Sequence, residues 1–375
     1  MVKKRLGIVY GTRPEFIKLW PIIRQLQDDP DFSTVTICTG QHREMLDVIH
    51  NTFGFTPDYH LSVFQKNQHL TDLSAKLFSS LGSTLRKLDL DAVVVQGDTA
   101  TTVIGAQAAF YTGLPVIHVE AGLRTDKLRN PFPEEANRRL VTQLADLHLA
   151  PTQLARTRLL AEKVPESRVA VTGNTVIDAL SMLENTPVHF EDPRAEEVVE
   201  SASPFLLVTC HRRENWAQLP QVAQALDHIA AEFPEWRILL PVHGNEDLRR
   251  SFEALIDRHK TVVLTGFLGY PEFLAAQKAA RIVLSDSGGV QEESPAFGTP
   301  VLCMRKFTER QEAVDAGCVT LVGTDTDAIV EAFTRLATDP GAYASMAHAA
   351  HPYGTGDAAV RSIEAIRTMF DKRTA

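Results

Sequence analysis

The stretch Leu6-Gly7-Ile8-Val9-Tyr10-Gly11-Thr12-Arg13-Pro14-Glu15 decides the fold. Its first half, Leu6–Tyr10, is an apolar run that predicts a buried strand, and Gly11 ends that run. Pro14 and Glu15 are typical of the first turn of a helix. A buried strand that passes through a short turn into a helix is the repeating unit of a parallel α/β sheet.

The same unit recurs along the whole chain, because short runs rich in Val, Ile and Leu alternate with longer helical patterns. The runs that we expect to be strands are Leu6–Tyr10, Thr34–Cys38, Ala92–Val95, Val116–Val119, Leu147–Ala150, Val169–Thr172, Phe205–Thr209, Ile238–Val242, Val262–Leu264, Ile282–Leu284, Val301–Met304 and Thr320–Val322. Helical patterns include Glu15–Gln27, Leu70–Leu88, Glu135–Leu144, Leu219–Phe233 and Tyr270–Ala280. Strands that are apolar along their whole length indicate parallel sheets covered on both faces. The sequence therefore predicts an α/β fold of two doubly wound, Rossmann-like domains that face each other across a cleft.

At 375 residues the chain exceeds the usual size of a single core, which agrees with two domains. The strand rhythm pauses after Gly173-Asn174, and prolines and acidic residues collect between Asp178 and Glu200. We therefore expect a first domain over residues 1–174 and a second over 175–357. The helical tail 358–375 is expected to pack back on the first domain.

The composition excludes several classes of protein. With 38 Lys and Arg against 47 Asp and Glu, the net charge is -9. Proteins that bind nucleic acid usually have the opposite, positive net charge, so nucleic acid is not an expected partner. No apolar run reaches the length of a membrane span. The four cysteines are scattered without the spacing of a metal site, and three of them lie in apolar runs typical of buried thiols. We expect a cytoplasmic protein that uses no metal.

Polar residues follow nearly every predicted strand. In open parallel sheets, ligands bind beyond the carboxyl ends of the strands. The segments at these ends are Gly11–Glu15, Gln41–Glu44, Gly97–Thr99, Glu120–Arg124, His211–Glu214, His243–Asn245 and Ser285–Gly289. A cleft between two domains is the simplest way to use these groups together.

The turn Ser287-Gly288-Gly289 follows the strand Ile282–Leu284 and precedes a helical stretch that begins near Val290. Glycines in such a turn let backbone amides approach a phosphate, and Glu293 is one helical turn away, where it can accept hydrogen bonds from ribose hydroxyls. The alternative is an ordinary strand–helix turn with a solvated glutamate.

The turn Gly11–Glu15 has a different sequence from the Gly-x-Gly-x-x-Gly fingerprint of dinucleotide sites, so it does not indicate NAD. Arg13 in this turn can pair with a diphosphate through a forked, charge-assisted contact. The neighbouring Pro14 and Glu15 carry no such information, because they are ordinary at the start of a helix.

Three carboxylates of the first half are candidates for the site, two of them at strand ends. Asp98 and Glu120 end neighbouring strand patterns, and Glu134 begins a helix after the turn Pro131-Phe132-Pro133. Carboxylates gathered around one ligand suit proton transfer, because burial and mutual repulsion raise pKa values toward neutrality. The alternatives are helix capping by Asp98 and compensation of the helix dipole by Glu134. Glu120 directly follows Val116–Val119, where neither alternative applies.

Two histidines follow strands of the second half. His211 has Arg212 and Arg213 beside it, which suits an anionic ligand, whereas His243 alone is a weaker candidate. A lone histidine is more often structural than functional. Phe273 lies on a helical pattern, where core packing is its default role.

Taken together, these segments resemble the UDP-N-acetylglucosamine 2-epimerases. The matching segments, in family order, are Gly11–Glu15, Gln41–Asp47, Gly97–Thr99, His118–Arg124, Pro133–Arg138, Gly173–Ala179, His211–Glu214 and Asp286–Glu293. The opening Gly-Thr-Arg-Pro-Glu is similar to the branch of the family that does not hydrolyse its substrate.

The resemblance implies the two-domain fold called GT-B, no cofactor, a homodimer and a UDP-sugar substrate. It implies catalytic roles for Asp98, Glu120, Glu134 and His211. It implies contacts with the UDP-sugar for Arg13, Lys18, Arg213, His243, Phe273, Ser287, Gly288, Gly289 and Glu293. The implied reaction removes the proton at sugar carbon 2 while UDP leaves carbon 1, and UDP then adds back to the 2-acetamidoglucal with the proton delivered to the opposite face.

Some positions depart from the family pattern. Gln96 stands where many members have a histidine, and Gln311 replaces a proline. Asn67 occupies the place of an arginine in relatives that need an activator, so the resemblance does not extend to activation by a second UDP-sugar. The alternatives to a non-hydrolysing epimerase are a hydrolysing epimerase that releases UDP and N-acetylmannosamine, a GT-B glycosyltransferase, and a catalytically silent sensor of nucleotide sugars.

Overall fold

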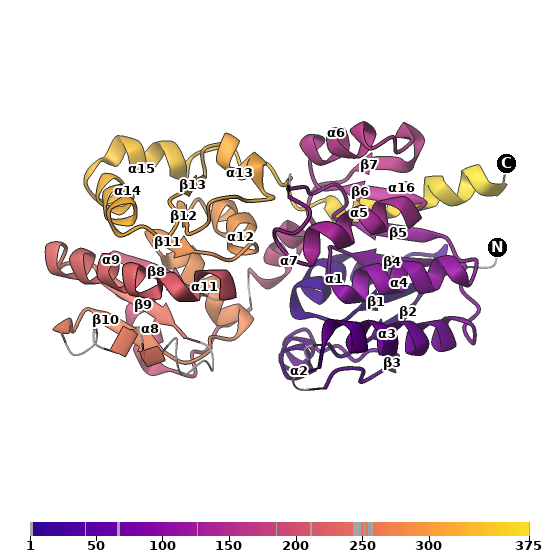
Figure 1. Cartoon of the computed structure of the whole chain (residues 1–375), viewed down its shortest axis with the longest axis horizontal. Coiled ribbons are helices and arrows are strands. Elements are labelled where there is room, and N and C mark those ends of the chain that lie inside the picture. The colour runs from indigo at the N-terminus through magenta and orange to yellow at the C-terminus, as the bar shows by residue number, and fades with distance from the viewer. Residues whose placement is uncertain are drawn as a thin grey trace. The chain divides into compact units, whose positions relative to one another are not determined.

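The protein is described by a computed structural model over residues 3–41, 43–65, 68–125, 127–184, 186–210, 212–242, 249–250, 252–253, 255 and 258–374. It divides into two compact units, Met1–Met182 with Tyr353–Ala375 and Leu183–Pro352 (Figure 1). Each unit contains one parallel sheet flanked by helices, so the predicted α/β fold with two Rossmann-like domains is confirmed. The first unit extends to Met182 rather than ending at Asn174.

The sheet of the first unit has seven strands in the order β3-β2-β1-β4-β5-β6-β7, and every neighbouring pair is parallel. The strands are β1 (Lys4–Tyr10), β2 (Phe32–Cys38), β3 (Tyr59–His60), β4 (Ala92–Gln96), β5 (Val116–Val119), β6 (Leu147–Ala150) and β7 (Val169–Val171). Six of them coincide with apolar runs of the sequence. The edge strand β3 was not predicted, because it consists of two exposed residues and has no apolar pattern.

Helices cover both faces of this sheet. They are α1 (Arg13–Gln27), α2 (Arg43–Thr52), α3 (Leu70–Leu85), α4 (Ala100–Tyr111), α5 (Glu134–Leu144), α6 (Gln153–Ala161) and α7 (Thr175–Leu183), with the C-terminal α16 (Ala358–Thr374). A core of fully buried side chains joins the sheet to α3 and α4, among them Val9, Ile37, Leu77, Leu81 and Val95.

The C-terminal helix α16 packs on the first unit through both of its ends. Asp178 of α7 accepts hydrogen bonds from the backbone amides of Ala358 (3.2 Å) and Ala359 (2.9 Å), so its carboxylate caps the start of α16. Near the other end, Arg373 Nη2 forms an ion pair with Asp146 Oδ1 at 2.7 Å. The Asp178 cap explains why α7 belongs to the first unit.

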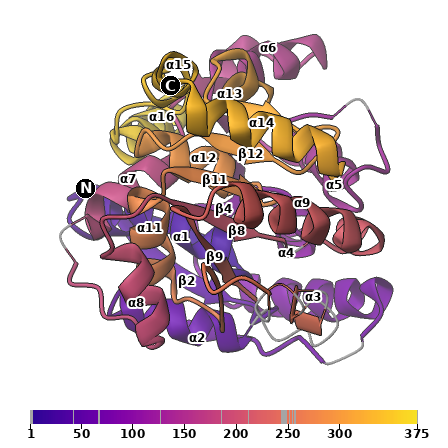
Figure 2. The same ribbon diagram turned by 90° about the vertical axis from the view of Figure 1, so that its left-hand side faces the viewer.

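The second unit has a six-stranded parallel sheet in the order β10-β9-β8-β11-β12-β13. Its strands are β8 (Phe205–Thr209), β9 (Arg237–Pro241), β10 (Val262–Thr265), β11 (Ile282–Ser285), β12 (Val301–Cys303) and β13 (Val319–Leu321). Its helices include α8 (Pro193–Val199), α9 (Leu219–Glu232), α11 (Tyr270–Ala279), α12 (Val290–Ala296), α13 (Gln311–Asp315), α14 (Thr326–Thr338) and α15 (Pro340–Ala347). Helices α9 and α14 lie side by side (Figure 2), and their apolar faces pack on the sheet around the buried Phe333.

The strand orders fix where each sheet can bind a ligand. The order reverses between β1 and β4 in the first sheet and between β8 and β11 in the second. At such a reversal the flanking helices depart to opposite faces, which leaves a crevice beyond the carboxyl ends of the two strands. The turns after these four strands are therefore where each unit is expected to bind a ligand.

Within the described residues, no helix is both long enough and apolar enough to cross a membrane. All four cysteines are buried as free thiols, and burial raises the pKa of Cys303 to about 12 and that of Cys318 to about 11.

Gly122 lies in the turn after β5 and offers a test of this packing. Its φ of +95° favours glycine, and an added Cβ would lie 2.4 Å from the carbonyl oxygen of Ala155 in α6. We expect Gly122→Ala to lower the free energy of unfolding of the first unit by at least about 3 kcal/mol, from backbone strain and overpacking together. Native-state hydrogen exchange of β5 and β6 amides measures this loss.

Gly113→Ala is the matched control, because Gly113 has a similar φ of +77° but nothing within 4 Å of an added Cβ. It should cost only the backbone term of about 1–2 kcal/mol. Equal losses in the two variants would contradict the close contact between Gly122 and α6.

Candidate active site

Glu15 connects the two turns at the strand reversal of the first sheet. Its carboxylate is buried, and one oxygen accepts hydrogen bonds from the backbone amides of Gly11 (2.9 Å) and Thr12 (2.7 Å). The other oxygen accepts from the hydroxyls of Thr99 (2.7 Å) and Thr102 (3.1 Å). Burial raises the pKa of the Glu15 carboxyl, and these four hydrogen bonds oppose that rise. The turn after β1 is thereby fixed to the turn after β4.

Lys18 and Glu120 form a buried ion pair between α1 and the end of β5. Lys18 Nζ lies 2.6 Å from Glu120 Oε1, and the two residues are only 6% and 8% exposed. The second carboxylate oxygen, Oε2, accepts a hydrogen bond from Gln96 Nε2 at the end of β4. Glu120 also has a left-handed backbone, with a φ of +61°, which costs a residue other than glycine about 1–3 kcal/mol. The structure thus brings two predicted site residues, Lys18 and Glu120, into direct contact.

Asp98 lies in the turn after β4, and helix α5 fixes its position. Arg138 Nε donates to Asp98 Oδ2 at 2.9 Å, and Asn137 Nδ2 donates to the backbone oxygen of Asp98 at 2.8 Å. Arg138 is in turn paired with the fully buried Glu135 at 2.7 Å. The Asp98 side chain stays 27% exposed, so it can still meet a ligand. Capping of α4 by Asp98 is excluded, because Thr99 is the N-cap and accepts from Thr102 N.

Asp98 and Glu120 follow neighbouring strands, since Gln96 of β4 pairs with Val119 of β5. The turn after β4, which contains Gly97 and Asp98, is close to the Glu120 carboxylate, because a Cβ added to Gly97 would lie 4.0 Å from Glu120 Oε2. Parallel neighbours therefore place both acids at one edge of the sheet.

The remaining candidates of the first unit lie at the starts of helices. Glu134 is the first residue of α5 and Arg13 the first residue of α1, and both are half-buried. His118, inside β5, is a core residue and was not among the predicted site residues. Burial lowers its pKa to about 4, so the ring is neutral near pH 7, and its Nε2 donates to the backbone oxygen of Gly97 at 2.7 Å.

In the second unit, the turn Ser287-Gly288-Gly289 follows β11 as predicted, and the following helix α12 is short (Val290–Ala296). The guanidinium of Arg310 lies against this turn, because a Cβ added to Gly288 would be only 2.6 Å from Arg310 Nη1. Arg310 Nε is oriented by Glu292 Oε1 at 2.6 Å. Arg310 also pairs with the buried Glu309, so two carboxylates balance its charge, and only glycine at position 288 leaves room for its guanidinium.

Glu293 and Phe273 lie on facing helices, α12 and α11. Glu293 is buried, and its two carboxylate oxygens accept from Tyr270 Oη at 3.0 Å and Gln277 Nε2 at 2.9 Å. These contacts fix the orientation of the carboxylate that was predicted to meet ribose hydroxyls. Phe273 is half-buried, which leaves part of the ring outside the core.

Asp286 connects the segments after β8 and β11 in the second sheet, as Glu15 connects the turns after β1 and β4 in the first. It is fully buried, and Oδ2 accepts from the backbone amide of Arg212 at 2.9 Å and from Asn215 Nδ2 at 3.0 Å. The turn after β11 is thereby fixed to the segment after β8. Three predicted residues of this unit, His211, His243 and the side chain of Arg213, lie outside the described residues.

Sequence reading did not select Glu15, Gln96, Asp286 or Arg310. Glu15 and Asp286 look like ordinary helix-start and turn residues, and only their burial distinguishes them. Arg310 is distant in sequence from Gly288, so no local pattern connects the two. The signal available for Gln96 was its position at the end of an apolar strand, directly before Gly97-Asp98.

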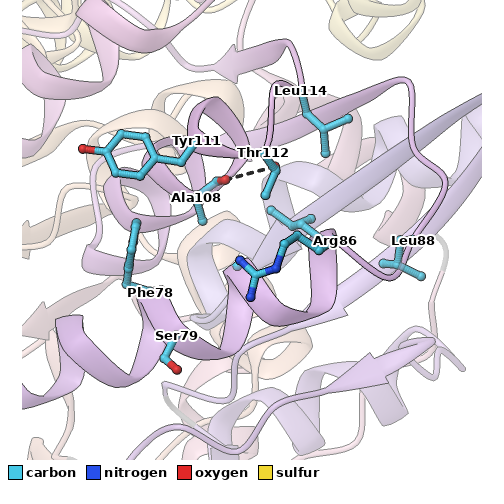
Figure 3. Close-up of a pocket in the computed structure, with 10 residues that line it drawn as sticks. Phe78, Ser79, Arg86, Leu88, Ala108, Tyr111, Thr112 and Leu114 are labelled. Carbon is cyan, nitrogen blue, oxygen red and sulfur yellow. Dashed lines mark hydrogen bonds between the residues drawn. The ribbon is translucent and has the colours of Figure 1, made fainter.

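A large cavity of about 890 Å³ lies elsewhere, between α3 and α4 (Figure 3). Phe78, Leu88, Tyr111 and Leu114 contribute to its lining, and Arg86 is its charged group. These residues come from the second half of α3, the end of α4 and the segments that lead from these helices into β4 and β5. Those segments enter the sheet at the edge opposite to Asp98 and Glu120. The topology therefore separates this cavity from the predicted site.

In the described part of the chain, no group of three or more His, Cys, Asp or Glu side chains is arranged to bind a metal ion.

Comparisons with known proteins agree with one another. A family model described as UDP-N-acetylglucosamine 2-epimerase matches residues 24–367. The UDP-N-acetylglucosamine 2-epimerase of Escherichia coli K12 is 43% identical over 365 residues, which cover 96% of this chain and 97% of that protein. The UDP-GlcNAc 2-epimerase of Neisseria meningitidis, solved with UDP-GlcNAc bound, has a TM-score of 0.89 at 40% identity and covers 97% of this chain and 99% of its own. S. aureus MnaA, solved with UDP, has a TM-score of 0.92 at 36% identity, over 100% of this chain and 98% of its own.

Proposed function

The chain belongs to the UDP-N-acetylglucosamine 2-epimerase family, and from that premise we propose that it interconverts UDP-N-acetylglucosamine and UDP-N-acetylmannosamine without hydrolysing either. The observation that carries the proposal is the acidic edge of the first sheet, where Asp98 and Glu120 follow adjacent strands and Lys18 of α1 pairs with Glu120. Two relatives solved with UDP-GlcNAc or UDP support the choice of ligand.

The proposed reaction is an elimination followed by an addition. A carboxylate takes the proton from carbon 2, the bond from carbon 1 to the UDP oxygen breaks, and a double bond forms between carbons 1 and 2. UDP then adds back to carbon 1 while carbon 2 receives a proton on its other face. We assign the proton transfers to Asp98, Glu120, Glu134 and His211 as a group. Acid–base groups of this kind typically contribute about 10²–10⁴-fold each to the rate.

Departure of UDP requires stabilisation of the charge that develops on its diphosphate. We assign this to Arg13 of the first domain and to the turn Ser287–Gly289 of the second. The glycines of that turn support the second assignment, because they let backbone amides approach a phosphate at the point where β11 ends and α12 begins. Glu293 is assigned to the ribose hydroxyls and Phe273 to the uracil ring, and Lys18, Arg213 and His243 to the rest of the UDP-sugar.

The cytoplasmic location is proposed on the family resemblance, as is the assignment of the non-hydrolysing branch. A hydrolysing relative would share nearly all of these residues, so the products of the reaction must separate the two.

Turnover of UDP-N-acetylglucosamine in heavy water tests the reaction. We expect deuterium at carbon 2 of both UDP-sugars, because the abstracted proton exchanges with solvent before it is replaced. NMR of the reaction mixture measures it directly. Epimerised product without deuterium would rule out proton abstraction, and free N-acetylmannosamine accumulating in equal amount with UDP would establish the hydrolysing reaction instead.

Asp98→Asn tests the acidic edge. The amide can still accept a hydrogen bond from Arg138 but cannot take a proton, so we expect kcat to fall by about 10²–10⁴-fold while UDP binding is kept. Steady-state kinetics and calorimetry of UDP binding measure the two quantities. Asp91→Asn is the matched control, because Asp91 precedes β4 at the opposite edge of the sheet. Unchanged turnover of Asp98→Asn would remove Asp98 from the mechanism.

We also infer a homodimer from the resemblance. The end of α4 supports it, because Phe110 and Tyr111 are 55% and 67% exposed there and provide an apolar surface for contact with another protein. Light scattering should give twice the chain mass of 41.4 kDa. A monomer at micromolar concentration would contradict this inference.

A further inference from the structure

Gln96 is the last residue of β4, and its side chain is almost entirely buried, with 3% of the residue exposed. Its amide group lies against the carboxylate of Glu120. An ionised carboxylate only accepts hydrogen bonds, so the amide must present its nitrogen, and Gln96 Nε2 donates to Glu120 Oε2.

The two oxygens of Glu120 have different partners. Lys18 Nζ binds Oε1 at 2.6 Å from α1, and Gln96 Nε2 binds Oε2 from β4. A single contact would leave the carboxylate free to turn about its terminal bond, whereas two contacts from different elements fix its plane. Together with the left-handed backbone of Glu120, they determine where its oxygens point.

Gln96 is itself firmly placed. Its backbone pairs with Val119 in the sheet, and its backbone oxygen accepts from Thr102 Oγ1 at 2.6 Å. The same hydroxyl lies 3.1 Å from the buried carboxylate of Glu15, so the strand end that carries Gln96 is part of the network around Glu15. The amide donor therefore has little freedom to move away from Glu120.

We propose that Gln96 is a positioning residue for the epimerisation, which orients the Glu120 carboxylate toward the substrate through its amide N–H. This inference rests on the proposed function, in which Glu120 takes part in proton transfer. Gln96 contributes no proton of its own and is not expected to contact UDP. Its effect should therefore fall on kcat and leave nucleotide binding unchanged.

Gln96→Leu tests the proposal, because leucine fills a similar volume without a donor. We expect kcat to fall by about 10- to 100-fold, as expected for loss of a hydrogen bond to a charged group. The KM for UDP-N-acetylglucosamine and the Kd for UDP should stay within about twofold of the unmutated values, since neither depends on proton transfer. Deuterium incorporation at carbon 2 should slow in step with kcat.

Gln96→His is the rescue variant, because an imidazole N–H can donate from the same position. It should retain kcat within about fivefold of the unmutated protein, given that a donor is present. Gln107→Leu is the matched control, because Gln107 lies on α4 and its amide bonds only the hydroxyl of Tyr111 at 3.4 Å among its described side-chain contacts. This control should leave kcat unchanged.

Three results would overturn the role of Gln96. They are an unchanged kcat in Gln96→Leu, a loss that appears in KM or in UDP binding instead of kcat, and a loss that histidine does not restore. An unmutated protein that incorporates no deuterium at carbon 2 would instead refute the proposed function, so the two failures are distinguishable.

Discussion

The ion pair between Lys18 and Glu120 is the interaction on which the site of the first domain depends. A carboxylate that is 8% exposed is costly unless a cation and further donors accompany it. Lys18 provides that cation from α1 and Gln96 provides a donor from β4, so three elements must be in register before Glu120 can be buried. Loss of either partner would leave a charged group poorly solvated in the middle of the site.

Two other buried carboxylates are also stabilised by donors from different segments of the chain. Glu15 in the first domain is a buried carboxylate that accepts hydrogen bonds from the turns after β1 and β4. Asp286 in the second domain is a buried carboxylate in the turn after β11, and it accepts hydrogen bonds from the segment after β8. Both lie at the point where the strand order reverses, which is where a doubly wound sheet opens a crevice. Glycine completes the arrangement in both domains. A Cβ on Gly11 would meet the hydroxyls of Thr39 and Thr101, and one on Gly288 would meet Arg310. In each domain, a buried carboxylate therefore fixes the turns at the strand reversal, and a glycine in one of those turns leaves room for neighbouring side chains.

The sequence predicted the strands of both sheets well, because parallel strands buried on both faces are continuous apolar runs. It missed β3, whose two residues are exposed, and it gave no measure of how deeply Glu15 or Asp286 would be buried. Motifs at the strand ends selected Asp98 and Glu120 for a physical reason, since parallel neighbours end at one edge of the sheet. The contact of Arg310 with Gly288 could not be foreseen, because the two residues are far apart in the chain and no strand adjacency connects them. The position of Gln96 at the end of β4 was an available signal, but its contact with Glu120 depends on the orientation of both side chains. Capping of α4 was assigned to Asp98 as an alternative, whereas the adjacent Thr99 has the N-cap geometry.

The central claim is that the acids of the first sheet move a proton at carbon 2 while UDP detaches from and returns to carbon 1. The most direct test begins from the intermediate. The protein is mixed with 2-acetamidoglucal and UDP, with no UDP-sugar present, and the mixture is followed by NMR. The account predicts that UDP-N-acetylglucosamine and UDP-N-acetylmannosamine both form. Unchanged glycal and UDP, in a preparation that epimerises UDP-N-acetylglucosamine, would contradict it.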